Sequence, residues 1–145
     1  MVKTLEQFVL DCLHLSDPWR VDEVESPTEG GNPYTQVYLS VPRGSLVPCP
    51  KCGRMCICHD HTRERVWRGS DVMNAYTFIH ARVPRTDCPE CGVLTAEVPW
   101  ARPGARFTLC FETMMLALAM EMPMTTVARM VHVDPKTVQG VVRRY

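Results

Sequence analysis

The 145-residue sequence lacks a secretion signal and an apolar run long enough to span a membrane. Residues 1–19 place acidic residues among the apolar ones and have no basic lead-in, which argues against a signal peptide. The longest apolar stretch, residues 107–124, contains Glu112, Glu121 and Pro123 and falls short of the roughly 20 apolar residues that a bilayer span needs. We therefore expect a cytoplasmic chain with no membrane role. In that reducing compartment, the even number of cysteines does not indicate a disulfide framework.

The sequence also lacks a net charge, but its charges are unevenly distributed. Residues 1–47 carry three Lys/Arg and seven Asp/Glu, whereas residues 101–145 carry six Lys/Arg and three Asp/Glu. A surface that binds a polyanion is therefore expected near the C-terminus.

The N-terminal segment has the pattern of a short helix followed by a strand. Apolar residues recur at helical spacing over residues 5–15, and a Ser-Asp-Pro sequence then ends the pattern. Cys12 lies on the apolar face and is expected to be a small buried residue. Residues 25–33 are rich in proline, glycine and polar residues and predict a loop, after which residues 36–41 alternate as a strand.

Two CxxCG motifs, CPKCG and CPECG, stand out among the eight cysteines. Two thiolates three positions apart can bind one ion, and the glycine after each pair, Gly53 or Gly92, can adopt the left-handed conformation that such a turn needs. Zinc prefers a closed tetrahedral set of four thiolates, which leaves no open position for a catalytic water. We therefore predict one structural Zn²⁺, and no zinc hydrolase, at Cys49, Cys52, Cys88 and Cys91.

A second group of donors, in CICHDH, offers a rival ligand set: Cys56, Cys58, His59 and His61. Neighbouring side chains of a strand point to opposite faces, so only some of the four could converge on one ion. Packing within a strand is the favoured interpretation, and a second metal site or a redox role is the alternative.

The interval between the two motifs is long enough to hold strands of its own. Residues 65–68 and 76–83 are strand-like, with Tyr76, Phe78 and His80 on one face, and residues 69–71 are expected to turn between them. Residues 93–98 then alternate as a closing strand.

The last forty residues have the pattern of three helices. Phe107, Cys110, Phe111, Met114, Leu118 and Met122 follow helical spacing, which predicts a buried first helix with core methionines. Thr108 can cap this helix, and Pro123 ends it. A second helix, starting at Thr125 or Thr126, would turn residues such as Val127 inward.

Residues 127–138 match the spacing of a helix-turn-helix. Ala128 permits close helix packing, Val133 is expected to fill the corner, and Asp134 and Pro135 are a good cap and first residue for a third helix reaching Tyr145. His132 occupies the turn position where glycine is usual, so it must adopt a left-handed conformation.

With Val138 and Val141 turned inward, the third helix presents a polar face that could read a major groove. Gln139 can pair with adenine, and the basic residues can bind phosphates or guanine. An ordinary solvated helix face is the alternative. The predicted DNA-binding residues are Lys136, Thr137, Gln139, Gly140, Arg143 and Arg144.

Together these patterns predict an α+β chain in three parts. Residues 1–47 would hold the N-terminal helix and a leading strand, residues 48–100 a zinc-ribbon-like antiparallel β domain, and residues 101–145 a helix-turn-helix domain of three helices.

The sequence resembles the N-terminal region of insertion-sequence transposases of the ISL-three family. The resemblance is carried from about residue 49 to the end by CPKCG, HD (59–60), ERVWR (64–68), HARVPR (80–85), CPECG, VPWARPG (98–104), FT and FE (107–112) and VARMV (127–131), with a weaker echo in LSDPWRVDEV (15–24). It implies a zinc-binding domain and a helix-turn-helix that together recognise the terminal inverted repeats of a mobile element. Family members continue into a catalytic domain of RNase-H type, to which nothing in these residues corresponds, so no catalytic residue is expected here.

Two functional interpretations follow. The first is sequence-specific binding of double-stranded DNA in a bacterial cytoplasm, at the nucleoid. The second is a stand-alone zinc-ribbon and helix-turn-helix regulator, or a protein-binding adaptor. Self-association and contact with a transposase are open as further partnerships, and no small-molecule substrate is expected.

Overall fold

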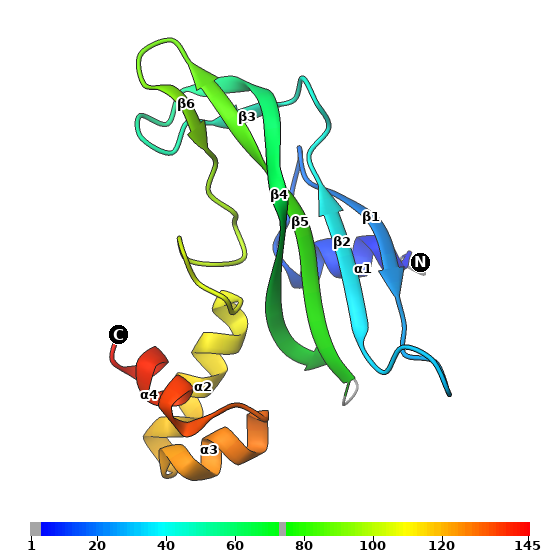
Figure 1. The fold of residues 1–145 in the computed structure, drawn as a ribbon, viewed down its shortest axis with the longest axis vertical. Coiled ribbons are helices and arrows are strands. Elements are labelled where there is room, and N and C mark those ends of the chain that lie inside the picture. The colour runs from blue at the N-terminus through cyan, green and yellow to red at the C-terminus, as the bar shows by residue number, and fades with distance from the viewer. Residues whose placement is uncertain (1–3, 73–74) are drawn as a thin grey trace.

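A computed structural model describes residues 4–72 and 75–145 of the chain, which forms a curled sheet with helices at both ends of the sequence (Figure 1). The helices are α1 (Leu5–Cys12), α2 (Leu109–Glu121), α3 (Met124–Val131) and α4 (Pro135–Val142). The strands are β1 (Arg20–Glu25), β2 (Thr35–Ser40), β3 (Leu46–Pro48), β4 (Met55–Val72), β5 (Ala75–Cys88) and β6 (Gly92–Thr95). The predicted α+β class is confirmed.

The long hairpin of β4 and β5 forms the centre of the sheet (Figure 1). The strand order is β1-β2-β5-β4-β3, with β6 also paired to β5. Pairings among β3, β4, β5 and β6 are antiparallel, whereas β2 lies parallel to β5. The CxxCG motifs therefore lie at one end of the hairpin, and the helix-turn-helix lies beside the other end (Figure 1).

The turn predicted at residues 69–71 is wrong, because these residues lie within β4. Gly69 pairs with Thr77, and the strand continues to Val72. Gly69 is buried, and a Cβ atom there would lie 3.6 Å from the Cγ2 atom of Thr108. That distance is an ordinary van der Waals contact, so the glycine is a residue of the strand beside the N-cap of α2 and does not reverse the chain.

The sheet's inner face packs around three tryptophans. Trp67 is fully buried, and its ring contacts Trp100 edge to face at a centroid distance of 5.3 Å. Trp100 in turn contacts Trp19 at 4.7 Å. This core combines residues from both sides of the boundary predicted at 47/48, and the division of residues 1–100 into two parts stays a prediction.

Helix α1 covers one side of this core through Val9 and Leu13. It ends at Cys12, sooner than the apolar pattern predicted. Cys12 is exposed, so the prediction that it is buried is wrong. The apolar stripe marks the correct helix but is wider than the surface that the sheet covers.

The C-terminal helices form a second core, which α2 enters through Phe111 and Met115. Thr108 caps α2, as predicted, by accepting a hydrogen bond from the Phe111 amide at 3.2 Å. Cys110 and Met114 face solvent, contrary to the prediction, and Met120 is 84% exposed. Because α2 is apolar around most of its circumference, helical spacing alone could not identify its buried face.

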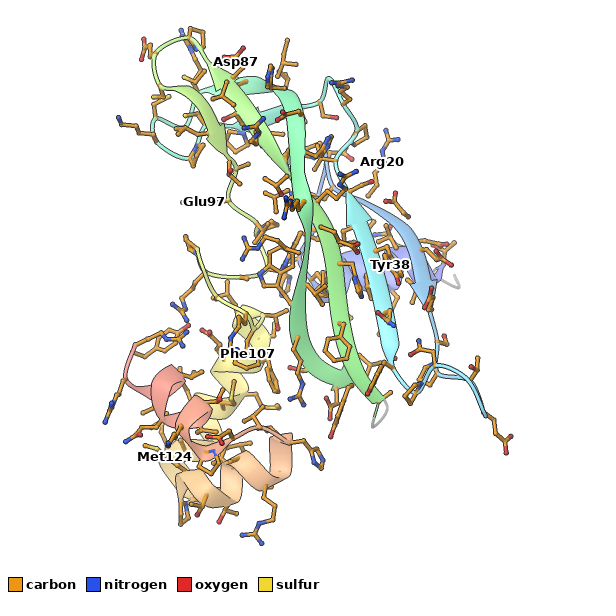
Figure 2. The ribbon with its side chains drawn as sticks, viewed as in Figure 1. Arg20, Tyr38, Asp87, Glu97, Phe107 and Met124 are labelled. Carbon is orange, nitrogen blue, oxygen red and sulfur yellow. The ribbon has the colours of Figure 1, made fainter. Side chains whose placement is uncertain are left out.

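Figure 2 shows the position of this second core relative to the sheet. Phe107 lies between β4 and the helices, and Met124 marks the start of α3 beyond it. No helix in the described part of the chain is long and apolar enough to cross a membrane.

Candidate metal centre and nucleic-acid interface

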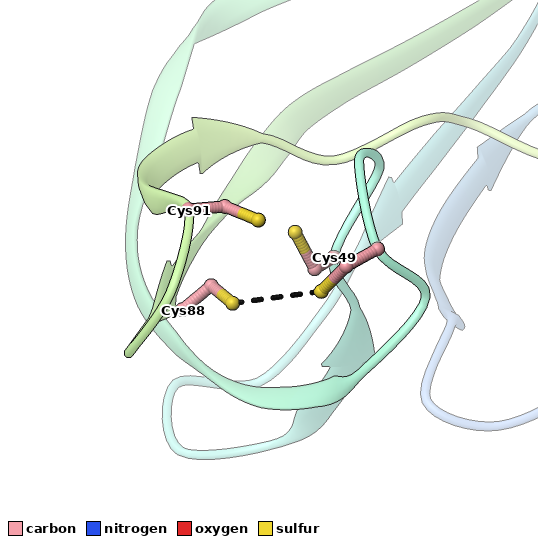
Figure 3. A group of neighbouring side chains, drawn as sticks. Cys49, Cys88 and Cys91 are labelled. Atoms are coloured by element: carbon pink, nitrogen blue, oxygen red, sulfur yellow. Dashed lines mark hydrogen bonds between the residues drawn. The ribbon is translucent and has the colours of Figure 1, made fainter.

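The four cysteines of the CxxCG motifs converge at the end of the sheet where β3, β4, β5 and β6 meet (Figure 3). Their sulfur atoms all lie within 4.8 Å of one another, and the Sγ atoms of Cys52 and Cys88 are 3.6 Å apart. Tetrahedral zinc with Zn–S bonds of about 2.3 Å needs sulfur atoms about 3.8 Å apart. The four side chains therefore fit one structural Zn²⁺, and the predicted ligand set is brought together.

The backbone of each motif forms the turn that such a site requires. Gly53 and Gly92 have φ values of 78° and 81°, the left-handed conformation predicted for them. The Gly53 amide donates to the Cys49 carbonyl at 2.9 Å, which closes the first turn. These turns aim backbone N–H groups at the sulfur atoms.

Those N–H groups favour ionised sulfur at the first cysteine of each motif. Hydrogen bonds from the amides of Cys91 and Glu90 lower the pKa of Cys88 to about 6. The amides of Cys52 and Lys51 similarly lower the pKa of Cys49. Burial and the neighbouring thiols raise the pKa of Cys91 to about 12 in the absence of metal. Four such close sulfur atoms can all be thiolates only beside a cation, which zinc supplies.

The rival ligand set does not assemble around one point. Cys56 and Cys58 are 4% and 2% exposed, whereas Ile57 between them is 60% exposed and His59 faces solvent, the alternation expected of a strand. His61 Nε2 lies 2.7 Å from the Val41 carbonyl, which can only accept, so that nitrogen carries a proton. Among the described residues, the only group that could hold a metal is the four-cysteine cluster.

The alternative redox role for Cys56 and Cys58 also lacks support in the geometry. Burial raises the pKa of the Cys58 thiol, which disfavours the reactive thiolate. Cys56 packs against Cys49 and Cys88 beside the zinc site. Both residues thus fill the interior of the sheet.

Helices α3 and α4 form the predicted helix-turn-helix. Ala128 is buried at their contact, and His132 adopts the left-handed conformation with φ 56° and ψ 51°. Val133 packs against the second core. Asp134 caps α4 by accepting a hydrogen bond from the Lys136 amide at 2.7 Å. Local signals therefore placed every part of the turn correctly.

The predicted DNA-binding residues are not equally free on α4. Val138 and Val141 are fully buried, which turns Lys136 and Gln139 to solvent, with Thr137 and Gly140 half-buried. The helix ends at Val142 rather than Tyr145, so the two terminal arginines lie beyond its last residue. Arg143 is exposed, but the Nη1 atom of Arg144 lies 3.5 Å from Glu112.

Arg68 on β4 joins the sheet to the helix-turn-helix, a role that sequence reasoning missed. Its guanidinium donates to the carbonyls of Val131 at 2.6 Å and His132 at 3.0 Å, the last carbonyls of α3 and its turn. It also lies over the rings of Tyr76 and Phe111, at 4.7 and 4.8 Å. A cation at a helix C-terminus complements the helix dipole.

Glu112 on α2 forms a second junction. Its side chain is fully buried and accepts two hydrogen bonds from Arg102, at 2.7 and 2.8 Å, and one from the Tyr145 hydroxyl at 2.8 Å. Burial raises the pKa of Glu112, but the hydrogen bonds from Arg102 and Tyr145 outweigh it and lower the pKa. The residue therefore stays ionised and ties the chain after the zinc finger to the C-terminus.

A four-cysteine zinc site on a β hairpin, followed by a helix-turn-helix, is the architecture of a zinc-stabilised DNA-binding region. Residues 45–91 match the zinc-finger of transposase IS204/IS1001/IS1096/IS1165, and residues 96–145 match the helix-turn-helix domain of transposase family ISL3. The two matches follow one another along the chain and confirm the resemblance, seen in its sequence, to the N-terminal region of ISL3-family transposases.

Curated relatives agree with this assignment. The transposase for insertion sequence element IS1557 is 29% identical over 127 residues in two strains of Mycobacterium tuberculosis, CDC 1551 / Oshkosh and ATCC 25618 / H37Rv. The match covers 86% of this chain and 29% of each relative. No solved structure matches the chain significantly. The matched domains thus include a helix-turn-helix of the DNA-binding type, and the chain spans less than a third of the length of these transposases.

Proposed function

We propose that this chain recognises a specific double-stranded DNA sequence through α4, as the region of a transposase that binds the terminal inverted repeats of its element. The observation that carries the proposal is the orientation of α4 within a complete helix-turn-helix. Burial of Val138 and Val141 leaves a continuous polar face for the major groove.

The exposed residues of α4 divide into two kinds of contact. Gln139 offers an amide that can bond both N6 and N7 of adenine, which supplies base discrimination. Lys136 and Arg143 carry exposed charges suited to phosphates or guanine. Arg144 is held by Glu112, so we expect it to contribute less than Arg143 to DNA binding.

The zinc centre supports this function without taking part in chemistry. Its four thiolates would hold the far end of the β4–β5 hairpin, and the same hairpin carries Arg68, which fixes the α3–α4 turn. DNA binding of this kind would place the chain at a bacterial nucleoid. Cleavage and strand transfer would require a catalytic domain in addition to the two matched here.

Selection of bound duplexes from a random DNA pool by the zinc-loaded chain tests the proposal. We expect an enriched motif whose affinity falls as salt concentration rises. Gln139→Ala should weaken binding to the enriched motif by roughly 5- to 150-fold, from about 1–3 kcal/mol for a bidentate base contact. Gln7→Ala on α1 is the matched control, because Gln7 is exposed far from α4.

Absence of any enriched motif, with zinc and fold intact, would overturn the proposal in favour of a protein-binding adaptor. An enriched motif that Gln139→Ala, Lys136→Ala and Arg143→Ala all leave unchanged would remove α4 from the interface.

A further inference from the structure

A hollow of about 300 Å³ lies between the outer face of the sheet and the start of α4. The sheet lines it with Val66, Arg68 and Phe78, and the helix-turn-helix lines it with Val133 and Thr137. Arg106 and Phe107 line it from the connector, residues 96–108, which leads from β6 into α2. Thr137 belongs to the predicted DNA-binding face, so the hollow is continuous with that face. Figure 2 shows Phe107 in this position, between β4 and the helices.

Arg106 is the exposed charge of this hollow. Its guanidinium lies over the Phe107 ring, 5.9 Å from the centroid, which holds the cation beside the helix-turn-helix. Among residues 4–72 and 75–145, no carboxylate forms an ion pair with Arg106, and no acidic residue lines the hollow.

The other arginines nearby have partners within the protein. Arg68 donates to the carbonyls of Val131 and His132, and Arg102 is paired with the buried Glu112. Arg106 is therefore the cation of the connector that remains available to an anion from solution.

The start of α4 does not offer an anion site of its own. Asp134 already accepts the hydrogen bond of the Lys136 amide, and its carboxylate would repel a phosphate at the helix N-terminus. A phosphate approaching this end of α4 would instead find the guanidinium of Arg106 on one flank.

We infer that Arg106 binds a backbone phosphate of the duplex whose major groove receives α4, so that the connector forms part of the DNA interface. This inference rests on the function proposed above. A helix in a major groove about 12 Å wide is bordered by phosphates on both sides. Because Thr137 and Arg106 share the hollow, the strand that borders the groove on the Thr137 side passes Arg106.

A phosphate contact has a signature that a base contact lacks. Each neutralised phosphate contributes about 0.9 to the slope of log affinity against log salt concentration, whatever the sequence. If the contribution of one such contact to affinity is zero near 1 M salt, its removal weakens binding about eightfold at 0.1 M salt, since 10 to the power 0.9 is about 8. Arg106→Ala should show this loss equally on specific and non-specific duplexes.

The experiment measures affinity of the zinc-loaded chain at several salt concentrations for two labelled duplexes, the motif enriched by selection and a scrambled version of it. Arg106→Ala should lower the salt slope by about 0.9 on both duplexes, and Arg106→Lys should retain most of it. Arg20→Ala is the matched control, because Arg20 is exposed at the start of β1, far from α2, α3 and α4 (Figure 2). Thermal melting and zinc content establish that each variant is folded.

If the wild type binds DNA and Arg106→Ala has the same affinity and the same salt dependence of affinity, the inference is overturned and the proposed function is left intact. A loss confined to the enriched motif would also overturn it, because that outcome identifies a base contact. Failure of the wild type to bind either duplex would overturn the proposed function, and the inference with it.

Discussion

Replacement of Arg68 by methionine should uncouple the helix-turn-helix from the sheet. The guanidinium bridges β4 to the carbonyls of Val131 and His132, and its side chain is 13% exposed. Methionine keeps much of the aliphatic packing against Tyr76 and Phe111 but removes both hydrogen bonds and the charge. The carbonyls of Val131 and His132 then lose their donors.

The size of the effect follows from these contacts. A hydrogen bond from a charged donor contributes about 1.5–3 kcal/mol, so two such bonds set an upper range of about 3–6 kcal/mol. His132 is exposed, so water can replace part of what its carbonyl loses. We therefore expect Arg68→Met to lower the free energy of unfolding by about 2–4 kcal/mol. Arg68→Lys keeps the charge but loses the planar pair of donors, so its free energy of unfolding should lie between those of the wild type and Arg68→Met.

Urea unfolding of the zinc-loaded chain measures this difference with two probes. Tryptophan fluorescence follows the core that packs on the sheet, which contains Trp19, Trp67 and Trp100, and far-ultraviolet circular dichroism follows the helices. The helical transition should move to lower urea in Arg68→Met and separate from the fluorescence transition. Arg65→Met is the matched control, because Arg65 is exposed on the same strand and lies over the Trp67 ring at 4.6 Å.

A change below about 0.5 kcal/mol for Arg68→Met, the range usual for surface substitutions, would refute this reasoning. Equal stability of the lysine and methionine variants would refute the role of the hydrogen bonds in particular.

Two other sites give equally direct predictions. Cys88→Ser should abolish stoichiometric zinc binding and the cooperative melt of the sheet, because small zinc sites couple binding to folding, whereas the control Cys12→Ser should keep both. Mass spectrometry measures the zinc content, and a thermal melt measures the folding. Retention of zinc by Cys88→Ser would contradict the assignment of Cys88 as a ligand. Glu112→Gln should destabilise the chain by roughly 1–3 kcal/mol at pH 7. Because the Glu112 pKa is lowered in the folded chain by Arg102 and Tyr145, this stabilisation is fully present above the ordinary Glu pKa of about 4.3 and is lost as pH falls below it. The gap in urea midpoint between wild type and Glu112→Gln should therefore narrow from pH 7 toward pH 3, and a constant gap would contradict the ionised state of Glu112.

Much of the candidate site could be predicted from the sequence because its signals are local. A CxxCG motif encodes its own turn, and Gly53 and Gly92 have the conformation that the motif requires. Asp134 and Pro135 similarly start α4 wherever the chain places it, since a helix cap depends on residues two or three positions away. The left-handed His132 follows from its place in the turn.

Predictions that depended on which neighbour covers a surface were less successful. Cys12 and Met114 lie on apolar faces of the correct helices but are exposed. Gly69 looks like a turn residue, yet it continues β4 because β5 supplies hydrogen-bond partners there. Periodicity describes what a segment could bury, and the partner that buries it lies far away in sequence.

The sequence by itself thus determined which four cysteines cluster, where the helix-turn-helix lies and which transposases the chain resembles, because each of these depends on short-range spacing and on few distant contacts. Only the tertiary structure decided that β2 pairs in parallel with β5, that Arg68 caps α3 and that Glu112 joins Arg102 to Tyr145. Those hydrogen bonds link residues 10 to 63 positions apart. Their partners are selected by how the sheet curls and how the two cores pack, which no local pattern records.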